Sequence, residues 1–252
     1  MQFMNKYVEF VSDENFEIAV KRVLDAYKEF EKEKQDTQPL DVLLDKDKQT
    51  IDEFKTVFDL CSKDLTLKEW TEKEVERQLD KKINNKIGEF HQELLGYVDG
   101  WINLKTGDST GLDLKNEEET IFIELKNKYN TMNKTSKEGC QMALENVVEK
   151  YPNAIGYWAY VISRNYKSQE DVWKYSRTIN DEKIKFNNPR IRKISGDNLY
   201  EMITGDKDAL EKVCRAIPLA IKNIKEKEED YISSEDLATL DEFYKTVFKK
   251  SE

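Results

Sequence analysis

The chain has 252 residues, of which 38% are hydrophobic and 37% are charged, a composition typical of a soluble protein long enough to bury a sizeable core. No run of about 18 apolar residues occurs and the first residues lack an apolar signal core, so we expect neither a membrane span nor a secretory leader. Three widely spaced cysteines favour a reducing cytoplasm and argue against a disulfide framework and a cysteine-based zinc site. The single histidine excludes a multi-histidine metal site.

The formal net charge of -10 opposes binding to nucleic acid, because phosphate contacts require lysine and arginine. The distribution of charge matters more than its sum. Residues 164–193 carry nine basic side chains against four acidic ones, whereas residues 226–252 carry nine acids against four bases. The middle of the chain is therefore basic enough to bind an anionic partner, although a set of solvated faces explains such charge runs equally well.

The first 100 residues predict helices. Apolar residues recur at helical spacing between Phe16 and Phe30, after a helix start at residues 12–15, and two further amphipathic stretches cover residues 51–60 and 67–95. From Gly96 the pattern changes to short apolar runs separated by glycines. We expect strands near residues 97–104, 111–115 and 120–128, with a hairpin turn at 116–119.

A helix beginning at Ser136 and ending before Pro152 follows, and then a continuous apolar run at residues 155–162 that is typical of a buried strand. A second mixed region covers about 164–204, and helices near 206–228 and 233–250 finish the chain. This order predicts an α/β core. We expect a helical N-terminal region (residues 1–83), a core (residues 84–205) and C-terminal helices (residues 206–252) that pack together as one domain.

The strand at residues 120–128 contains charged residues that need a partner, because burying an unpaired charge costs several kcal/mol. Side chains alternate along a strand, so Glu124 and Lys126 lie on one face, about 7 Å apart. Asp113 closes the preceding short strand and lies beside them if the two strands pair as a hairpin. Two carboxylates and a lysine at one point suit a Mg²⁺ site for phosphodiester hydrolysis.

In such a site Asp113 and Glu124 would bind the metal, and the Leu125 carbonyl on the strand edge is a third candidate ligand. Lys126 would hold or deprotonate the attacking water, or stabilise charge on phosphorus; the sequence does not choose between these roles. The alternative is a salt-bridged surface hairpin in which Glu124 and Lys126 face solvent.

Asp113, Glu124 and Lys126, in this order of elements, resemble the PD-(D/E)xK nuclease superfamily. The longer strings Gly-Leu-Asp-Leu-Lys-Asn (111–116) and Glu-Leu-Lys-Asn-Lys-Tyr-Asn-Thr-Met-Asn (124–133) resemble type II restriction endonucleases that cut GGNCC-type sites. The resemblance is strongest over residues 84–205, and Leu112 stands where the superfamily name has proline. It implies a central mixed sheet flanked by helices, Asp113 and Glu124 as metal ligands, and Lys126 as the catalytic lysine.

The resemblance further implies a Mg²⁺-dependent, sequence-specific endonuclease that cuts double-stranded DNA at a short palindromic site in a restriction-modification system. A cognate DNA methyltransferase would be its genetic partner. Because a palindromic duplex mirrors a two-fold axis, we expect a homodimer. Two alternatives stay open: a repair or recombination nuclease of the same superfamily, and a catalytically inert DNA-binding module.

In similar nucleases a glutamate from the helix before the core reaches the metal site, and Glu93 is our candidate for it. Glu89 is the second choice, and a solvated helix glutamate is the alternative for both. His91 and Gln141 are possible assistants at the phosphate, although a lone histidine is more often a satisfied, partly buried residue.

Candidate DNA contacts fall into two groups. The first is the polar stretch after the motif, where lysine suits phosphate and asparagine can read base edges. Its alternative role is a loop capping the next helix, with Thr135 or Ser136 as N-cap. The second group is a set of arginines in the basic region. The candidates are Lys128, Asn130, Asn133, Lys134, Arg164, Arg177, Arg190 and Arg192.

Overall fold

The computed structural model describes residues 5–36, 51–105, 107–226 and 233–248. They form two compact units, one made of residues 1–20 and 88–252 and the other of residues 21–87. The elements are α1 (Asp13–Asp36), α3 (Glu53–Ser62), α4 (Leu67–Gly96), β1 (Trp101–Asn103), β2 (Leu114–Asn116), β3 (Ile121–Lys128), α5 (Lys134–Lys150), β4 (Ile155–Ile162), η1 (Arg164–Tyr166), β5 (Glu170–Val172), β6 (Tyr175–Ile179), β7 (Glu182–Phe186), β8 (Ile191–Ser195), α6 (Gly196–Thr204), α7 (Ala209–Ile224) and α8 (Ser234–Val247).

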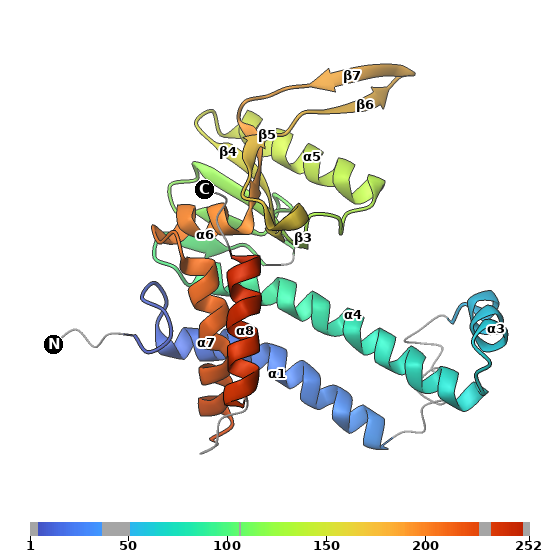
Figure 1. Cartoon of the computed structure of the whole chain (residues 1–252). Helices are drawn as coiled ribbons and strands as arrows, with labels where there is room; N and C mark the ends of the chain where they lie inside the picture. The colour runs from blue at the N-terminus through green and yellow to red at the C-terminus, as the bar shows by residue number, and fades with distance from the viewer. Residues whose placement is uncertain (1–4, 37–50, 106, 227–232, 249–252) are drawn as a thin grey trace. The chain divides into compact units, whose positions relative to one another are not determined.

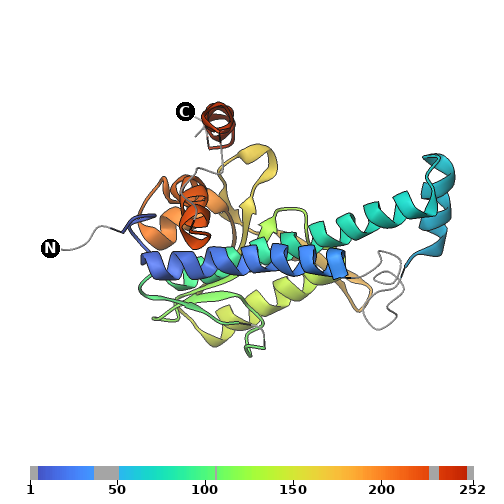
Figure 2. The ribbon, with the colours of Figure 1, turned by 90° about the horizontal axis from the view of Figure 1, so that it is seen from below.

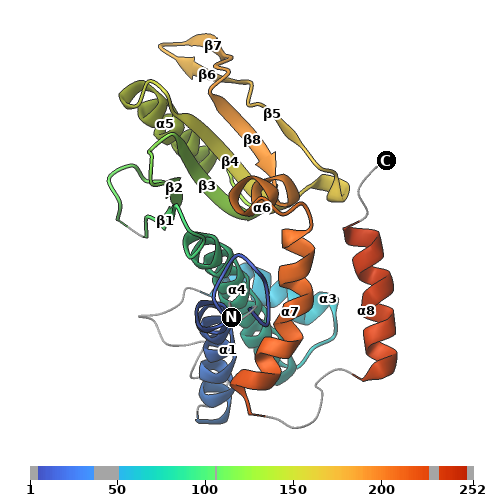
Figure 3. The ribbon, with the colours of Figure 1, turned by 90° about the vertical axis from the view of Figure 1, so that its left-hand side faces the viewer.

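A six-stranded mixed sheet forms the centre of the first unit (Figure 1), and Figure 3 shows its strands in the order β1-β2-β3-β4-β8-β5. β1, β2 and β3 form an antiparallel meander, whereas β3, β4 and β8 are parallel and β5 returns antiparallel to β8. All six strands come from residues 84–205. The predicted α/β fold with a mixed sheet flanked by helices is therefore confirmed.

Helix α5 covers one face of the sheet because it connects the parallel strands β3 and β4, and such a connection needs a crossover (Figure 3). Leu144 of α5 packs on Gly156 of β4, where a Cβ atom would lie 3.0 Å from the leucine side chain. Phe122 and Trp158 are buried in the same apolar cluster as Leu144. The α5 face of the sheet therefore holds a packed core.

Helix α6 lies on the opposite face of β4 and β8 (Figure 3). It begins at Gly196, which contacts the backbone of Val161, and ends at Gly205 in the left-handed conformation (φ 73°). Helices α7 and α8, seen almost end-on in Figure 2, follow it. The Arg215 guanidinium of α7 lies 4.5 Å from the ring centre of Tyr244 of α8. It also forms an ion pair with the Asp241 carboxylate of α8.

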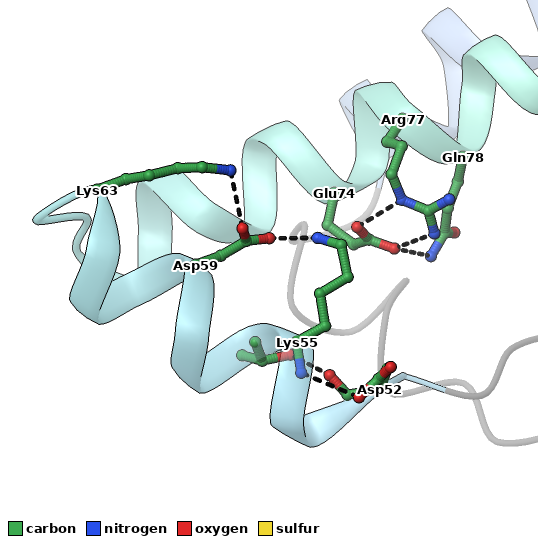
Figure 4. A network of polar contacts seen from close by, with 8 residues as sticks. Asp52, Lys55, Asp59, Lys63, Glu74, Arg77 and Gln78 are labelled. Atoms are coloured by element: carbon green, nitrogen blue, oxygen red, sulfur yellow. Dashed lines mark hydrogen bonds and ion pairs between the residues drawn. The ribbon is translucent and has the colours of Figure 1, made fainter.

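The second unit is helical, as predicted for this region, and has a small apolar cluster centred on Trp70 and Val75. Asp52 caps α3 by accepting from the Lys55 amide, and the Asp59 carboxylate binds both Lys55 and Lys63 (Figure 4). On α4, the Glu74 carboxylate accepts from Arg77 and Gln78. Surface ion pairs such as those of Asp59 stabilise little individually.

Helix and strand expectations agree closely with the structure where the apolar pattern is long. Two local expectations were wrong. Asp113 does not close a strand but directly precedes β2, and the N-cap of α5 is Asn133, whose side chain accepts from the Ser136 amide, rather than Thr135 or Ser136. None of the helices in the described ranges is both long and apolar enough to cross a membrane.

The close approach of α6 to β4 predicts that Gly196→Ala destabilises the protein. An added Cβ would lie 2.7 Å from the Val161 Cα, so backbone has to move, at a cost of about 1–3 kcal/mol. Gly139→Ala on the exposed side of α5 is the matched control, because nothing lies within 4 Å and alanine favours the helix. Urea unfolding measures both, and equal stability of the two variants would contradict the predicted contact.

Candidate active site

Asp113 is fixed against β3 by its own carboxylate. The register pairs Leu114 with Ile123, so the preceding residue, Asp113, lies opposite Glu124. Asp113 Oδ2 accepts from the Leu125 amide at 2.7 Å, and its backbone amide donates to the Ile123 carbonyl at 2.9 Å. The Leu125 amide, which would otherwise bond the main chain of the neighbouring strand, thus bonds the Asp113 side chain. This hydrogen bond holds the carboxylate at the sheet.

Glu124 and Lys126 lie on the α5 face of β3, as the alternation of side chains predicts. Lys126 Nζ is 2.5 Å from Glu124 Oε1, and only 12% of the glutamate side chain is exposed. The alternative of a hairpin with both side chains in solvent is therefore excluded for Glu124. Asp113, Glu124 and Lys126 thus form one charged cluster, and all three residues are partly buried.

In this cluster two carboxylates, those of Asp113 and Glu124, lie near a single positive charge, the Lys126 ammonium. Burial raises the pKa of Asp113, and the Lys126 charge and the Leu125 amide offset this only in part. Burial and the nearby Asp113 charge raise the pKa of Glu124. Burial lowers the pKa of Lys126, but the charges and hydrogen bond of its carboxylate neighbours outweigh burial and raise it. The site is short of positive charge.

This donor set fits a hard divalent cation. Mg²⁺ takes one or two protein carboxylates and completes its shell with water and phosphate oxygens. The Leu125 carbonyl points to the same side of β3 as its amide, where Asp113 lies, because both groups of a strand residue face one neighbour. In the described part of the chain no cluster of three or more His, Cys, Asp or Glu side chains could enclose a metal. A bound cation would therefore have to complete its shell with water or substrate.

Helix α5 adds a group that the sequence did not reveal. Trp158 is the β4 partner of Glu124, and Lys137 Nζ lies 5.4 Å from its ring centre and 5.9 Å from that of Trp173. The charges of Glu124, Lys126, Asp113 and Lys137 all act on the buried Cys140 thiol, whose pKa is raised chiefly by burial. Lys137 thus brings a second ammonium close to the cluster, and no local pattern in the sequence marks it for this position.

Comparison with known proteins identifies the family. A family model described as Eco47II restriction endonuclease matches residues 8–226. The chain is 34% identical over 224 residues to the type II restriction enzyme Sau96I of Staphylococcus aureus, which covers 86% of this chain and 80% of that protein. It is also 34% identical over 160 residues to the type II restriction enzyme Eco47II of Escherichia coli. That match covers 62% of this chain and 66% of the Escherichia coli protein.

The chain belongs to the Eco47II restriction endonuclease family. The resemblance inferred from the motif is thereby confirmed, and the protein is a site-specific deoxyribonuclease.

In this restriction endonuclease three of the predicted arginines have internal partners. Arg190 Nη1 donates to the carbonyls of Val148 and Pro152 at 2.6 and 2.9 Å, at the end of α5. Arg177 Nη2 donates to both oxygens of Glu145, and Arg192 Nε donates to Glu170 at 3.0 Å. These guanidiniums hold elements of the fold together, so their assignment to DNA stays a prediction that the geometry does not favour.

The remaining predicted DNA contacts lie on the surface. Lys128, Asn130 and Lys134 are exposed at and after the end of β3, and Arg164 is exposed in η1. Asn133 is exposed too, although its side chain caps α5. The first three follow Lys126 by two, four and eight residues, and their contact with DNA stays a prediction.

The assisting residues proposed on α4 and α5 are buried, except Glu89. Glu93 Oε1 accepts from the Tyr97 hydroxyl at 2.8 Å, and the charges that shift the pKa values of Asp113 and Glu124 come from the cluster itself. Gln141 Oε1 is buried without a hydrogen-bond partner in the described residues. Catalytic roles for Glu93, Glu89 and Gln141 stay predictions.

His91 links α4 to α6. Its Nδ1 lies 2.7 Å from the Tyr200 hydroxyl, and both side chains are buried. Burial lowers the pKa of His91 to about 4, so the imidazole is neutral at pH 7. His91 is therefore a buried histidine with a hydrogen-bond partner, the structural role that the sequence left open beside a role at the phosphate.

Stability should therefore fall as the pH falls below about 6.5, the ordinary pKa of histidine. Between that value and about 4 the unfolded chain binds a proton that the folded chain does not, which costs about 1 kcal/mol per pH unit. His91→Gln removes this dependence and retains a polar partner for Tyr200. Urea unfolding of both proteins at pH 7.5, 6.5 and 5.5 measures the difference, and parallel profiles would refute a buried neutral His91.

Proposed function

We propose that this protein is a Mg²⁺-dependent endonuclease of a restriction-modification system that hydrolyses both strands of DNA at a short palindromic GGNCC-like site. The observation that carries the proposal is the Asp113, Glu124 and Lys126 cluster, formed by the predicted residues in a chain of the restriction endonuclease family. The protein would act in the cytoplasm as a homodimer with one active site per strand. A cognate methyltransferase would protect host sites.

Phosphodiester hydrolysis needs a positioned water, relief of negative charge on phosphate and stabilisation of the leaving oxygen. Asp113 and Glu124 would hold Mg²⁺ with the Leu125 carbonyl, and Mg²⁺ when bound would supply positive charge at the phosphate and activate water. The Lys126 ammonium is held beside Glu124, where it can orient the attacking water or donate to a phosphate oxygen. The Leu125 amide fixes Asp113 in place before substrate arrives.

Asp113→Asn tests the proposal directly. The amide oxygen still accepts from Leu125, so the fold is retained, but the lost charge should lower cleavage of unmethylated plasmid by about 100-fold or more. Asp108→Asn is the matched control, because this carboxylate only accepts from Thr110 in a nearby loop. Wild-type protein should give discrete fragments with Mg²⁺ and none with EDTA.

Three results would count against the proposal: full activity of Asp113→Asn or of Lys126→Ala, cleavage that persists in EDTA, and cutting only at ends or junctions. The last result would favour a repair or recombination nuclease. The ends of the fragments, mapped on a plasmid of known sequence, would give the recognised bases and the stagger.

Lys137 would contact a phosphate next to the scissile bond, since its ammonium is held over Trp158 beside Glu124. A hydrogen bond to a charged group contributes about 1.5–3 kcal/mol, so Lys137→Met should lower kcat/KM by about 10-fold or more. Lys150→Met is the control, because this lysine lies over Tyr151 (5.1 Å) at the other end of α5. Equal kcat/KM for the two variants would rule out a specific role for Lys137.

A further inference from the structure

A two-stranded ribbon stands apart from the central sheet. β6 and β7 pair only with each other, and Figures 1 and 3 show them extending beyond the ends of the larger sheet. Asn180 and Asp181 join them with positive φ angles of 50° and 66°, the conformation of a tight hairpin turn. An isolated two-stranded hairpin is at best marginally stable in water, so contacts with the rest of the protein must hold this ribbon in place.

The base of this ribbon is braced against α5. Glu145 binds Arg177 and the hydroxyl of Tyr175, and the Arg177 guanidinium lies 4.5 Å over the ring of Phe186. The rings of Tyr175 and Phe186 stack at 5.1 Å. At the base of the ribbon this face is thereby occupied in holding it to the protein, and the Arg177 side chain is only 12% exposed.

The opposite face is polar and uncovered. The register pairs Ser176 with Lys185 and Thr178 with Lys183, and residues directly opposite in an antiparallel pair share a face. All four side chains are exposed. Two hydroxyls and two ammonium groups make a compact surface of hydrogen-bond donors, with acceptors only on the hydroxyls. The sequence of β6 and β7 places no acid on this face.

The ribbon is connected to the active site by packed rings. Trp158, the partner of Glu124, contacts Trp173 at 4.6 Å; Trp173 contacts Tyr175 at 5.4 Å, and Tyr175 contacts Phe186. Together with one strand spacing, these steps place the base of the ribbon within about 20 Å of Glu124. One turn of B-DNA is about 34 Å, so a duplex bound at Glu124 would have base pairs within the reach of the ribbon.

We propose that the face of Ser176, Thr178, Lys183 and Lys185 enters the DNA major groove and is the element that reads the recognition sequence. The inference rests on the proposed function, because it assigns the specificity of the same cleavage reaction. The major groove admits a two-stranded β-ribbon, lysine pairs with guanine O6 and N7, and serine and threonine hydroxyls bond either base edges or phosphates. Arg177, in contrast, positions the ribbon and does not touch DNA.

Two double variants test the hydroxyls and the lysines of this face separately. Ser176→Ala with Thr178→Ala removes hydroxyls, and Lys183→Gln with Lys185→Gln removes charge. Ile179→Thr, on the braced face near the turn, is the control for a change on the same ribbon. Full-length proteins are compared for cleavage positions on a mapped plasmid and for binding, in EDTA, to duplexes with and without the mapped site.

We expect the hydroxyl variant to lose about 10-fold or more in discrimination between the two duplexes, with cutting at sites that differ by one base pair. The lysine variant should bind more weakly, and the slope of log K against log salt should fall by about one for each phosphate that is no longer neutralised by a lysine. Ile179→Thr should match the wild type in both measurements.

Wild-type cleavage positions, rate and salt slope in both double variants would overturn the proposal. So would a loss of dimers in either variant with unchanged DNA binding per chain, since the ribbon would then join two copies of this chain. Absence of Mg²⁺-dependent cutting by the wild type is a different result, which refutes the proposed function itself.

Discussion

The structure depends most on how the charges of Asp113, Glu124 and Lys126 are accommodated at the junction of β2 and β3. Three ionisable groups in a mostly buried position are unfavourable unless each has a partner. Asp113 has the Leu125 amide, and Glu124 and Lys126 have each other. The first of these bonds replaces a main-chain bond, which explains why β2 begins only after Asp113. The same arrangement leaves two carboxylates beside a single ammonium group, which is the charge balance that the proposed cation site needs.

In the basic region the arginines and the lysines differ in whether they bind other groups of the protein. Arg177, Arg190 and Arg192 are the most obvious basic residues of residues 164–193, yet each binds a carboxylate or carbonyl of this chain. A planar guanidinium with several fixed donors suits such bracing. Lysines such as Lys183 and Lys185 remain exposed because their flexible stems need no internal partner. Within residues 164–193 the exposed basic side chains are therefore lysines, with the exception of Arg164.

The sequence predicted the long elements and the charged cluster well, for a physical reason. β4 (Ile155–Ile162) matches the expected strand, and α4 differs by one residue, because each has an uninterrupted apolar pattern. β1 and β2 lie in or overlap the strands expected near residues 97–104 and 111–115, but their limits, like those of β5, are set by their pairing partners, which no local pattern reveals. Asp113, Glu124 and Lys126 could be grouped because alternation and one hairpin suffice. Trp158 and Lys137 could not, because the registers of β4 and α5 against β3 depend on tertiary packing.

The packed rings between Glu124 and the β6–β7 ribbon suggest how recognition and cleavage are kept in fixed geometry. Protein interiors are close-packed, so a displacement of Phe186 or Tyr175 must be taken up by Trp173 and Trp158. Trp158 lies beside Glu124, and an error of about 1 Å at a reacting centre can cost 100-fold in rate. If the ribbon reads DNA as proposed, a ribbon held loosely would place DNA imprecisely at the proposed cation site. In that proposal the Glu145–Arg177 brace serves the chemistry as well as the fold, although neither residue belongs to the Asp113, Glu124 and Lys126 cluster.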